Sequence, residues 1–118
     1  MVVDDDPDIL LAVKIAFELK GIPILTASNG EECIEALEKG FRGVILMDIM
    51  MPEMDGWDTI RAMIDKELFE GNLIAMLTAR EDPGKKIEGL QEYVIDYLTK
   101  PFDPDELVNT VQEYIEVI

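Results

Sequence analysis

The sequence predicts an α/β fold in which a parallel β-sheet carries helices on both faces. Short apolar segments alternate with segments in which apolar residues recur at helical spacing, and this alternation repeats five times along 118 residues. No internal repeat, linker or low-complexity segment interrupts the pattern. Alternating strands and helices form parallel sheets whose strands are covered on both faces. We therefore expect a single domain over residues 1–118, without an output domain.

The expected strands are five short apolar segments. One of them contains Pro23, which cannot donate a backbone hydrogen bond and therefore indicates the beginning of a strand or an edge position. The expected strands cover residues 1–3, 22–27, 44–48, 73–77 and 94–99.

Capping and breaking residues mark the expected helices. Pro7 fits a first helical turn, and Ser28 or Asn29 can cap the second helix. Gly84 and Gly89 weaken the fourth predicted helix, because glycine inside a helix costs about 1 kcal/mol relative to alanine. The expected helices run from Pro7 to the residue before Gly21, from 28 or 29 to the residue before Gly40, over 57–66, over 82–92, and from 103–106 to the end. The last helix has an apolar stripe of Leu107, Val108, Val111, Tyr114, Ile115 and Ile118.

The composition limits the classes of partner. Ten basic and 26 acidic residues give a formal net charge of −16, which disfavours direct contact with nucleic acid or an anionic membrane. The apolar runs are too short to span a bilayer, and no secretory signal precedes the first strand. The single cysteine, Cys33, cannot form an internal disulfide. These features favour a cytoplasmic location.

Residues suited to bind a cation or a phosphoryl group follow four of the predicted strands. Asp4 and Asp5 follow the first, Asp48 ends the third, Thr78 ends the fourth, and Lys100 follows the fifth. Ligands of open parallel sheets bind in the crevice at the carboxyl ends of the strands. We therefore expect these side chains to form one site.

The acidic residues among them suit a divalent cation. Mg²⁺ prefers oxygen ligands and binds through one or two carboxylates, water and phosphate oxygens. Asp4, Asp5 and Asp48 would repel one another without a cation. The alternative is that the run of aspartates only caps the first helix, and this alternative stays open for Asp6 and Asp8.

Asp48 can be a plain metal ligand or a nucleophile. Carboxylates act as phosphoryl acceptors, and a hydroxyl and an ammonium group complete such a site by binding the phosphoryl oxygens. Thr78 and Lys100 supply these two groups, and we expect both at exposed strand ends, outside the core. Each is ordinary alone, since threonine is common at strand ends and lysine before proline is usually a solvated turn residue.

These residues lie in motifs that resemble the receiver domains of two-component response regulators, including the single-domain chemotaxis regulator. The similarity covers essentially the whole chain. It implies a flavodoxin-like (βα)5 fold, doubly wound, with strand order 2-1-3-4-5. The matching segments are Val2-Val3-Asp4-Asp5, the residues 48–56, Leu77-Thr78-Ala79 and the residues 97–102.

The resemblance assigns a role to each matching position. It implies that Asp48 is the phosphoryl acceptor and that Asp5 and Asp48 bind Mg²⁺ directly. Asp4 would act through water, and the backbone carbonyl of Met50 would be a further ligand. The remaining implied roles are contacts to the phosphoryl oxygens by Thr78 and Lys100, and an aromatic switch, triggered through Thr78, at Tyr97.

The same resemblance implies a signalling function. A sensor histidine kinase or a phosphotransfer protein would phosphorylate the chain, which would then change its surface over the fourth helix, fifth strand and fifth helix for a downstream protein target. It would catalyse only its own phosphorylation and dephosphorylation. Family members form a dimer through basic residues of the last helix, but no Lys or Arg follows Lys100 here. We therefore do not expect that dimer, and we expect a monomer or a weak dimer.

The site residues fit two other functions less well. A Mg²⁺-dependent phosphatase or phosphotransferase could use Asp48 on small substrates, but its loops are too short for a cap domain. A flavin-binding electron carrier shares the sheet order, but the aspartates at 4–6 would repel the flavin phosphate. The chain also departs from the family at two places, since only residues 1–3 precede the acidic pair and Tyr93-Val94 stands where Gly-Ala is frequent.

Overall fold

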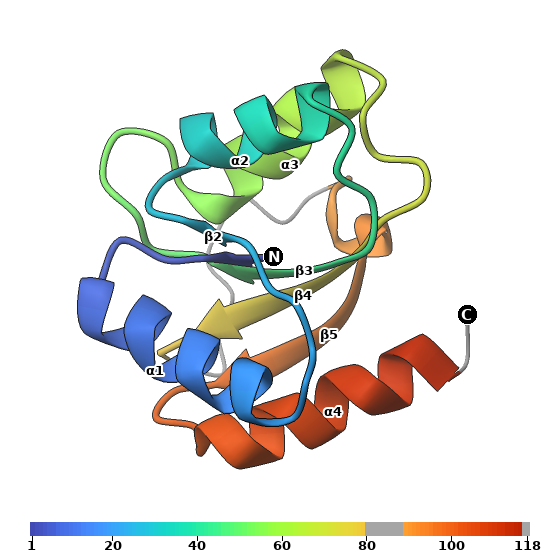
Figure 1. The fold of residues 1–118 in the computed structure, drawn as a ribbon. Helices are drawn as coiled ribbons and strands as arrows, with labels where there is room; N and C mark the ends of the chain where they lie inside the picture. Colours follow the sequence, from blue (N-terminus) through green and yellow to red (C-terminus); the bar gives the residue numbers. More distant parts are fainter. Residues whose placement is uncertain (80–88, 117–118) are drawn as a thin grey trace.

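The computed structural model describes residues 1–79 and 89–116, which form three layers (Figure 1). The strands are β1 (Val2–Val3), β2 (Thr26–Ala27), β3 (Val44–Asp48), β4 (Leu73–Thr78) and β5 (Val94–Thr99). The helices are α1 (Pro7–Leu19), α2 (Gly30–Glu38), α3 (Gly56–Asp65), α4 (Pro104–Glu116) and the 3₁₀ helix η2 (Gln91–Tyr93). The final helix of the chain, predicted as the fifth, therefore carries the label α4.

The sheet confirms the predicted fold class and strand order. Its five strands pair in parallel in the order β2-β1-β3-β4-β5. Helices α2 and α3 cover one face, and α1 and α4 cover the other (Figure 1). The arrangement is the doubly wound flavodoxin-like fold. No helix within the described ranges is long and apolar enough to cross a membrane.

The second strand is shorter than predicted. The prediction of a strand over 22–27 is wrong for residues 22–25, since β2 contains only Thr26 and Ala27. Pro23 lacks a backbone N–H, and pairing with β1 begins at Leu25, whose carbonyl accepts a hydrogen bond of 2.9 Å from the N–H of Val2. As its proline indicated, β2 lies at the edge of the sheet.

The segment before β5 also differs from the prediction. Most of the helix predicted over 82–92 lies outside the described residues. In its described end, Gly89 has a φ of +77°, and residues 91–93 form η2 rather than an α-helix. Glycine adopts this left-handed conformation at little cost. Gly89 therefore supplies a left-handed residue four positions before Tyr93-Val94, the pair that stands where family members often have Gly-Ala.

Side-chain caps explain where three helices begin. Asp6 caps α1 by accepting a hydrogen bond of 2.9 Å from the N–H of Asp8. Asn29, rather than Ser28, caps α2 through the N–H of Glu32 at 2.8 Å. A reciprocal capping box of Asp55 and Asp58 starts α3. The capping alternative thus holds for Asp6.

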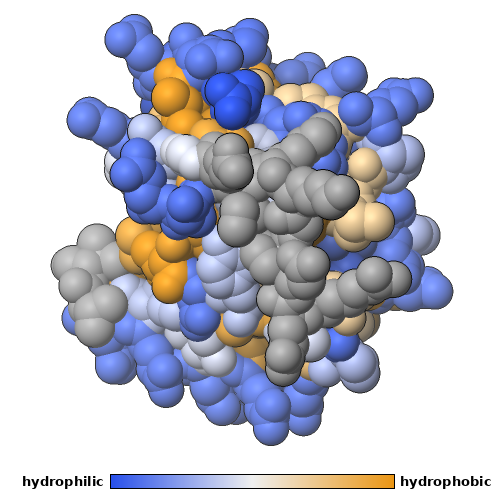
Figure 2. All heavy atoms as spheres, turned by 180° about the vertical axis from the view of Figure 1, so that it is seen from behind, coloured by the Kyte–Doolittle hydropathy of each residue, from blue (hydrophilic) through white to orange (hydrophobic). Residues whose placement is uncertain are grey.

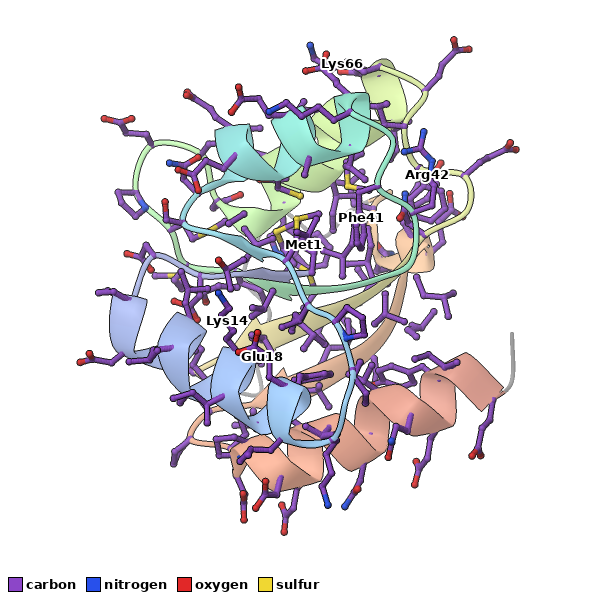
Figure 3. All side chains as sticks on the ribbon, viewed as in Figure 1. Met1, Lys14, Glu18, Phe41, Arg42 and Lys66 are labelled. Atoms are coloured by element: carbon purple, nitrogen blue, oxygen red, sulfur yellow. The ribbon has the colours of Figure 1, made fainter. Side chains whose placement is uncertain are left out.

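The apolar residues divide between the two faces of the sheet. Much of the face seen from behind in Figure 2 is hydrophilic, with hydrophobic surface confined to separate patches. Inside, side chains of the central strands alternate, so that Ile45 and Met47 pack with α2 and α3, while Leu46 packs with α1 and α4. Met1 belongs to the α2–α3 side (Figure 3). The predicted stripe of α4 is confirmed for Leu107, Val108 and Val111, which are buried, but not for Ile115, which is 51% exposed; Ile118 lies outside the described residues.

Helix α3 begins in direct contact with the end of β3. The N–H of Gly56 donates a 2.9 Å hydrogen bond to the carbonyl of Ile49. A Cβ atom added to Gly56 would lie 2.5 Å from the carbonyl oxygen of Asp48 and 2.9 Å from Cε of Met76. Because one of these atoms belongs to the backbone, only glycine fits here.

We expect Gly56→Ala to lower the free energy of unfolding by about 2 kcal/mol, a typical cost of overpacking. The comparison variant is Gly30→Ala in α2, where the added Cβ would lie 2.3 Å from the Thr59 hydroxyl oxygen and 2.9 Å from Sδ of Met54. The Thr59 side chain can rotate away at the cost of the hydrogen bond that it donates to the Asp55 carbonyl, whereas the Asp48 backbone cannot, so Gly30→Ala should lose less. Urea denaturation of both variants gives the comparison, and an equal or larger loss at Gly30 would contradict the argument.

Candidate functional site

Four strands deliver the predicted site residues to one edge of the sheet. Asp4 follows β1, Asp48 and Thr78 are the last residues of β3 and β4, and Lys100 follows β5. Asp4 and Asp48 are 0% and 4% exposed. Two carboxylates are therefore buried next to each other, which is costly unless a cation pairs with them.

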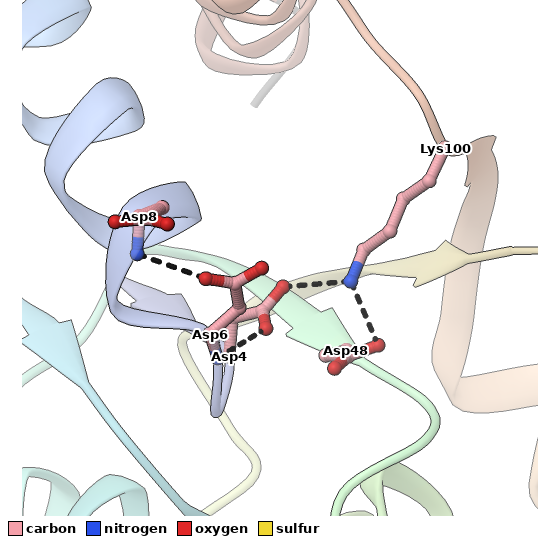
Figure 4. Close-up of polar contacts among 5 residues, drawn as sticks. All are labelled: Asp4, Asp6, Asp8, Asp48 and Lys100. Atoms are coloured by element: carbon pink, nitrogen blue, oxygen red, sulfur yellow. Dashed lines mark hydrogen bonds and ion pairs between the residues drawn. The ribbon is translucent and has the colours of Figure 1, made fainter.

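Lys100 is the cation that joins these carboxylates. Its Nζ donates to Oδ2 of Asp4 at 2.8 Å and lies 3.3 Å from Oδ1 of Asp48 (Figure 4). The other oxygen of Asp4 accepts a 2.9 Å hydrogen bond from the N–H of Asp6. The sequence predicted that Lys100 contacts phosphoryl oxygens, but it did not predict this pairing with Asp4.

The three predicted metal ligands form an acidic cluster. Asp4, Asp5 and Asp48 each place a carboxylate oxygen within 4.8 Å of the others, and Asp5 is exposed. A small oxygen-preferring cation that keeps several waters fits this donor set, because one side of the cluster is open. The backbone N–H of Met50 donates to the Asp48 carboxylate. The role of the Met50 carbonyl as a ligand stays a prediction.

Burial and charge shift the protonation of the site. Burial raises the pKa of Asp48, and the neighbouring charge of Asp4 raises it further, to about 7, although Lys100 and the Met50 N–H oppose the change. Burial alone would lower the pKa of Lys100, but its hydrogen bond to Asp4 and the charges of Asp48 and Asp4 give a net increase. Lys100 therefore stays an ammonium group, and Asp48 is the group that exchanges a proton near neutral pH.

Thr78 is more enclosed than the sequence predicted. The prediction of exposed strand ends is wrong for Thr78, which is 5% exposed, and for Lys100, whose side chain is 19% exposed. The physical reason is that β4 lies between β3 and β5, so its end remains inside the sheet. The Thr78 carbonyl accepts a 2.7 Å hydrogen bond from the N–H of Lys100, which ties the ends of β4 and β5 together.

Tyr97 lies on β5 and contacts α3. Its side chain is 36% exposed, and its ring centroid is 6.4 Å from that of Trp57 with the ring planes at 46°. Burial raises the pKa of the Tyr97 hydroxyl. Trp57 was missed by the sequence reasoning, because an aromatic residue after Gly56 gives no sign of the strand register that brings Tyr97 beside it.

A mostly apolar hollow of about 490 Å³ opens beside Lys100. It lies between the first turns of α1, with Ile9 and Ala12, and the connection from β5 to α4, with Pro101 and Phe102. Among the described residues that line it, Lys100 is the only cation. This composition suits an apolar protein surface better than a small phosphorylated substrate.

The comparisons with known proteins assign the class. The profile of the family described as "Response regulator receiver domain" matches residues 1–112. The chain belongs to this family. It is thus a receiver domain of the response regulators, the phosphorylation-dependent signalling switches of two-component systems.

Individual relatives agree with this assignment. A CheY-like receiver domain protein from Methanospirillum hungatei JF-1 has a structure with a TM-score of 0.93 and 50% sequence identity, over 99% of this chain and 93% of that one. CheY4 of Vibrio cholerae gives a TM-score of 0.82 and 32% identity over 95% and 93% of the two chains. The alkaline phosphatase synthesis transcriptional regulatory protein PhoP of Bacillus subtilis is 35% identical over 107 residues, 91% of this chain and 44% of PhoP. The chain spans less than half the length of that regulator.

We expect Asp48→Asn to stabilise the metal-free protein at pH 8 by about 2 kcal/mol and to have little effect at pH 4. The pKa of Asp48 is about 7 in the folded protein and 3.8 ordinarily. Protonation of Asp48 therefore stabilises the folded protein at low pH, and this stabilisation is lost as the pH rises from the lower to the higher value. Asparagine is neutral throughout and escapes this loss. Thermal melts in a chelator check the result. Asp65→Asn, at an exposed position of α3, is the control melted at the same pH values. A pH-independent effect of Asp48→Asn would contradict the pKa assignment.

We expect Mg²⁺ to stabilise the parent protein, because it relieves repulsion among the clustered carboxylates. At 100 times its Kd the ion should add about 2.7 kcal/mol. Asp5→Asn should remove most of this gain. Asp6→Asn should keep it, because Asp6 caps α1 and asparagine caps helices equally well. Calorimetric melts with and without Mg²⁺ give the comparison, and an unchanged parent melting temperature would contradict the metal site.

Proposed function

We propose that the Asp48 carboxylate accepts a phosphoryl group and that the chain signals by the change that follows. The observation that carries this proposal is the buried pair of Asp4 and Asp48 with the Lys100 ammonium 2.8 and 3.3 Å away. A nucleophile with an adjacent cation and acidic metal ligands is the equipment of phosphoryl transfer. The exposed cluster member, Asp5, gives the site an open side.

The transfer itself needs little from the protein beyond positioning. An oxygen of Asp48 attacks the phosphorus atom of the donor while the bond from phosphorus to the donor's histidine nitrogen breaks, and that nitrogen keeps the electron pair and takes up a proton. Asp5 and Asp48, Asp4 through water, and the Met50 carbonyl would hold Mg²⁺, and the bound ion would supply positive charge against the phosphoryl oxygens. The Asp48 side chain must be ionised to attack, which its pKa of about 7 permits for part of the molecules at neutral pH.

Lys100 and Thr78 would then bind the new phosphoryl oxygens. Lys100 already lies beside Asp48, so its ammonium can change partner with little movement. The Thr78 hydroxyl would be drawn towards the phosphoryl group, and Tyr97 on the neighbouring strand would respond. The surface that changes would extend over β5 and α4 and the segment that precedes them.

The partners would be a sensor histidine kinase or phosphotransfer protein and a downstream protein target. Leu11 and Ile15 are 58% and 48% exposed on α1, whose first turns border the apolar hollow beside Lys100. This surface suits a donor that reaches Asp48. Ile95 on β5 is 47% exposed on the side proposed to change and suits a target. We propose a monomer or weak dimer in the cytoplasm that catalyses only its own phosphorylation and dephosphorylation.

Incubation with acetyl phosphate and Mg²⁺ tests the acceptor. We expect one phosphoryl adduct by mass spectrometry, located on Asp48, and its loss with a chelator. Asp48→Asn keeps the shape but removes the nucleophile, so uptake should fall at least a hundredfold. Asp6→Asn carries the same chemical change on a residue that only caps α1 and should be labelled like the parent.

Two outcomes would contradict the proposal. Normal uptake by Asp48→Asn would show that another residue is the acceptor. Rapid, repeated hydrolysis of small phosphate esters by the parent would favour the small-substrate phosphatase instead.

A further inference from the structure

Trp57 links the start of α3 to Tyr97 on β5. The indole is 2% exposed, and its ring centroid lies 6.4 Å from that of Tyr97 with the planes tilted by 46°. Tyr97 is 36% exposed, so one part of its ring is packed and another part meets solvent. The indole is therefore a buried surface beside a ring that is partly exposed.

The turn that carries Trp57 packs against the backbone of Asp48. Trp57 follows Gly56, whose N–H binds the Ile49 carbonyl at 2.9 Å and whose missing Cβ would lie 2.5 Å from the Asp48 carbonyl. The Asp55–Asp58 capping box fixes the same turn. The peptide that carries the phosphoryl acceptor and the turn that carries Trp57 are thus in direct contact.

A second contact reaches Tyr97 from the sheet. Met76 on β4 is the register partner of Tyr97, and its Cε lies 2.9 Å from the position of a Cβ on Gly56. Met76 and Gly56 therefore pack directly against each other, and Trp57 and Met76 belong to the same core cluster. A change of position at the start of α3 cannot occur without a change at the surface on which Tyr97 rests.

We infer that Trp57 is a positioning residue for the Tyr97 switch and holds Tyr97 in the arrangement that accompanies a free Asp48 carboxylate. The structure has this carboxylate paired with Lys100 while the Tyr97 ring rests on Trp57. A contact made in one of two arrangements biases the equilibrium towards that arrangement. This inference rests on the proposed function, because it assumes that phosphorylation of Asp48 moves Tyr97.

This bias predicts that the contact of Trp57 with Tyr97 affects the binding of a phosphoryl mimic at Asp48. An aromatic pair of this kind shifts an equilibrium by about 3- to 10-fold. Removing the indole should therefore tighten binding of a phosphoryl mimic, beryllofluoride with Mg²⁺, by about 3- to 10-fold. The gain should require Tyr97, since linkage between two sites is carried by the element that both sites bias.

A double-mutant cycle tests this linkage. The affinity for beryllofluoride at saturating Mg²⁺ is measured by ¹⁹F NMR for the parent, Trp57→Leu, Tyr97→Leu and the double variant. We expect Trp57→Leu to bind more tightly than the parent, and the double variant to bind like Tyr97→Leu alone. Trp57→Phe keeps a ring at this position and should restore most of the parent affinity.

A control separates positioning from loss of packing. Met63 is 0% exposed in the same helix, and Met63→Ala should destabilise the fold without changing the beryllofluoride affinity. If Trp57→Leu is too unstable to titrate, Trp57→Phe with and without Tyr97→Leu gives the same cycle at smaller amplitude. Equal effects of the Trp57 substitution with and without Tyr97, no effect, or weaker binding would overturn the inference while the proposed function stands. A parent protein that does not bind beryllofluoride would overturn both.

Discussion

The ammonium group of Lys100 between two buried carboxylates is the interaction on which the site depends. Asp4 and Asp48 come from neighbouring parallel strands, so the sheet itself forces their like charges together. Lys100 reaches both from the far side of β4, and burial keeps the three groups coupled. Burial, and after it the repulsion from Asp4 that Lys100 does not cancel, raise the pKa of Asp48 to about 7. The site therefore favours any partner that brings positive charge, and in the proposed function a phosphoryl group that arrives with a cation would change the pairing of all three residues.

The packing around this pairing explains how a local change can reach the surface. The start of α3 touches the backbone of Asp48 so closely that only glycine fits at position 56. The Lys100 N–H binds the carbonyl of Thr78, which joins the ends of β4 and β5. Trp57 and Tyr97 then connect α3 to the outer strand. Through these contacts, a displacement at Asp48 would reach β5 in the switch that we propose.

The sequence predicted the sheet and the gathering of Asp4, Asp5 and Asp48, because the alternation of strands and helices brings strand ends to one edge. The strand order came from the resemblance, since periodicity does not specify it. The length of β2 was not predictable from its apolar residues alone, because pairing, limited by Pro23, decides where a strand begins. The burial of Thr78, the contact of Trp57 with Tyr97 and the pairing of Lys100 with Asp4 depend on register and on neighbours distant in sequence. Glycine at 89 was interpreted as a weak point of a helix, whereas it adopts a left-handed φ.

Amide hydrogen exchange with and without beryllofluoride and Mg²⁺ tests most directly whether the charge pairing at Asp48 controls the outer strand. The account predicts changed exchange at the ends of β1 and β3 and also along β5, residues 94–99, with no change in the distant helix α2. Asp48→Asn should abolish both responses. A change confined to residues near Asp4 and Asp48, with β5 unaltered in the parent protein, would contradict the account, because it would leave a metal and phosphoryl site without a switch.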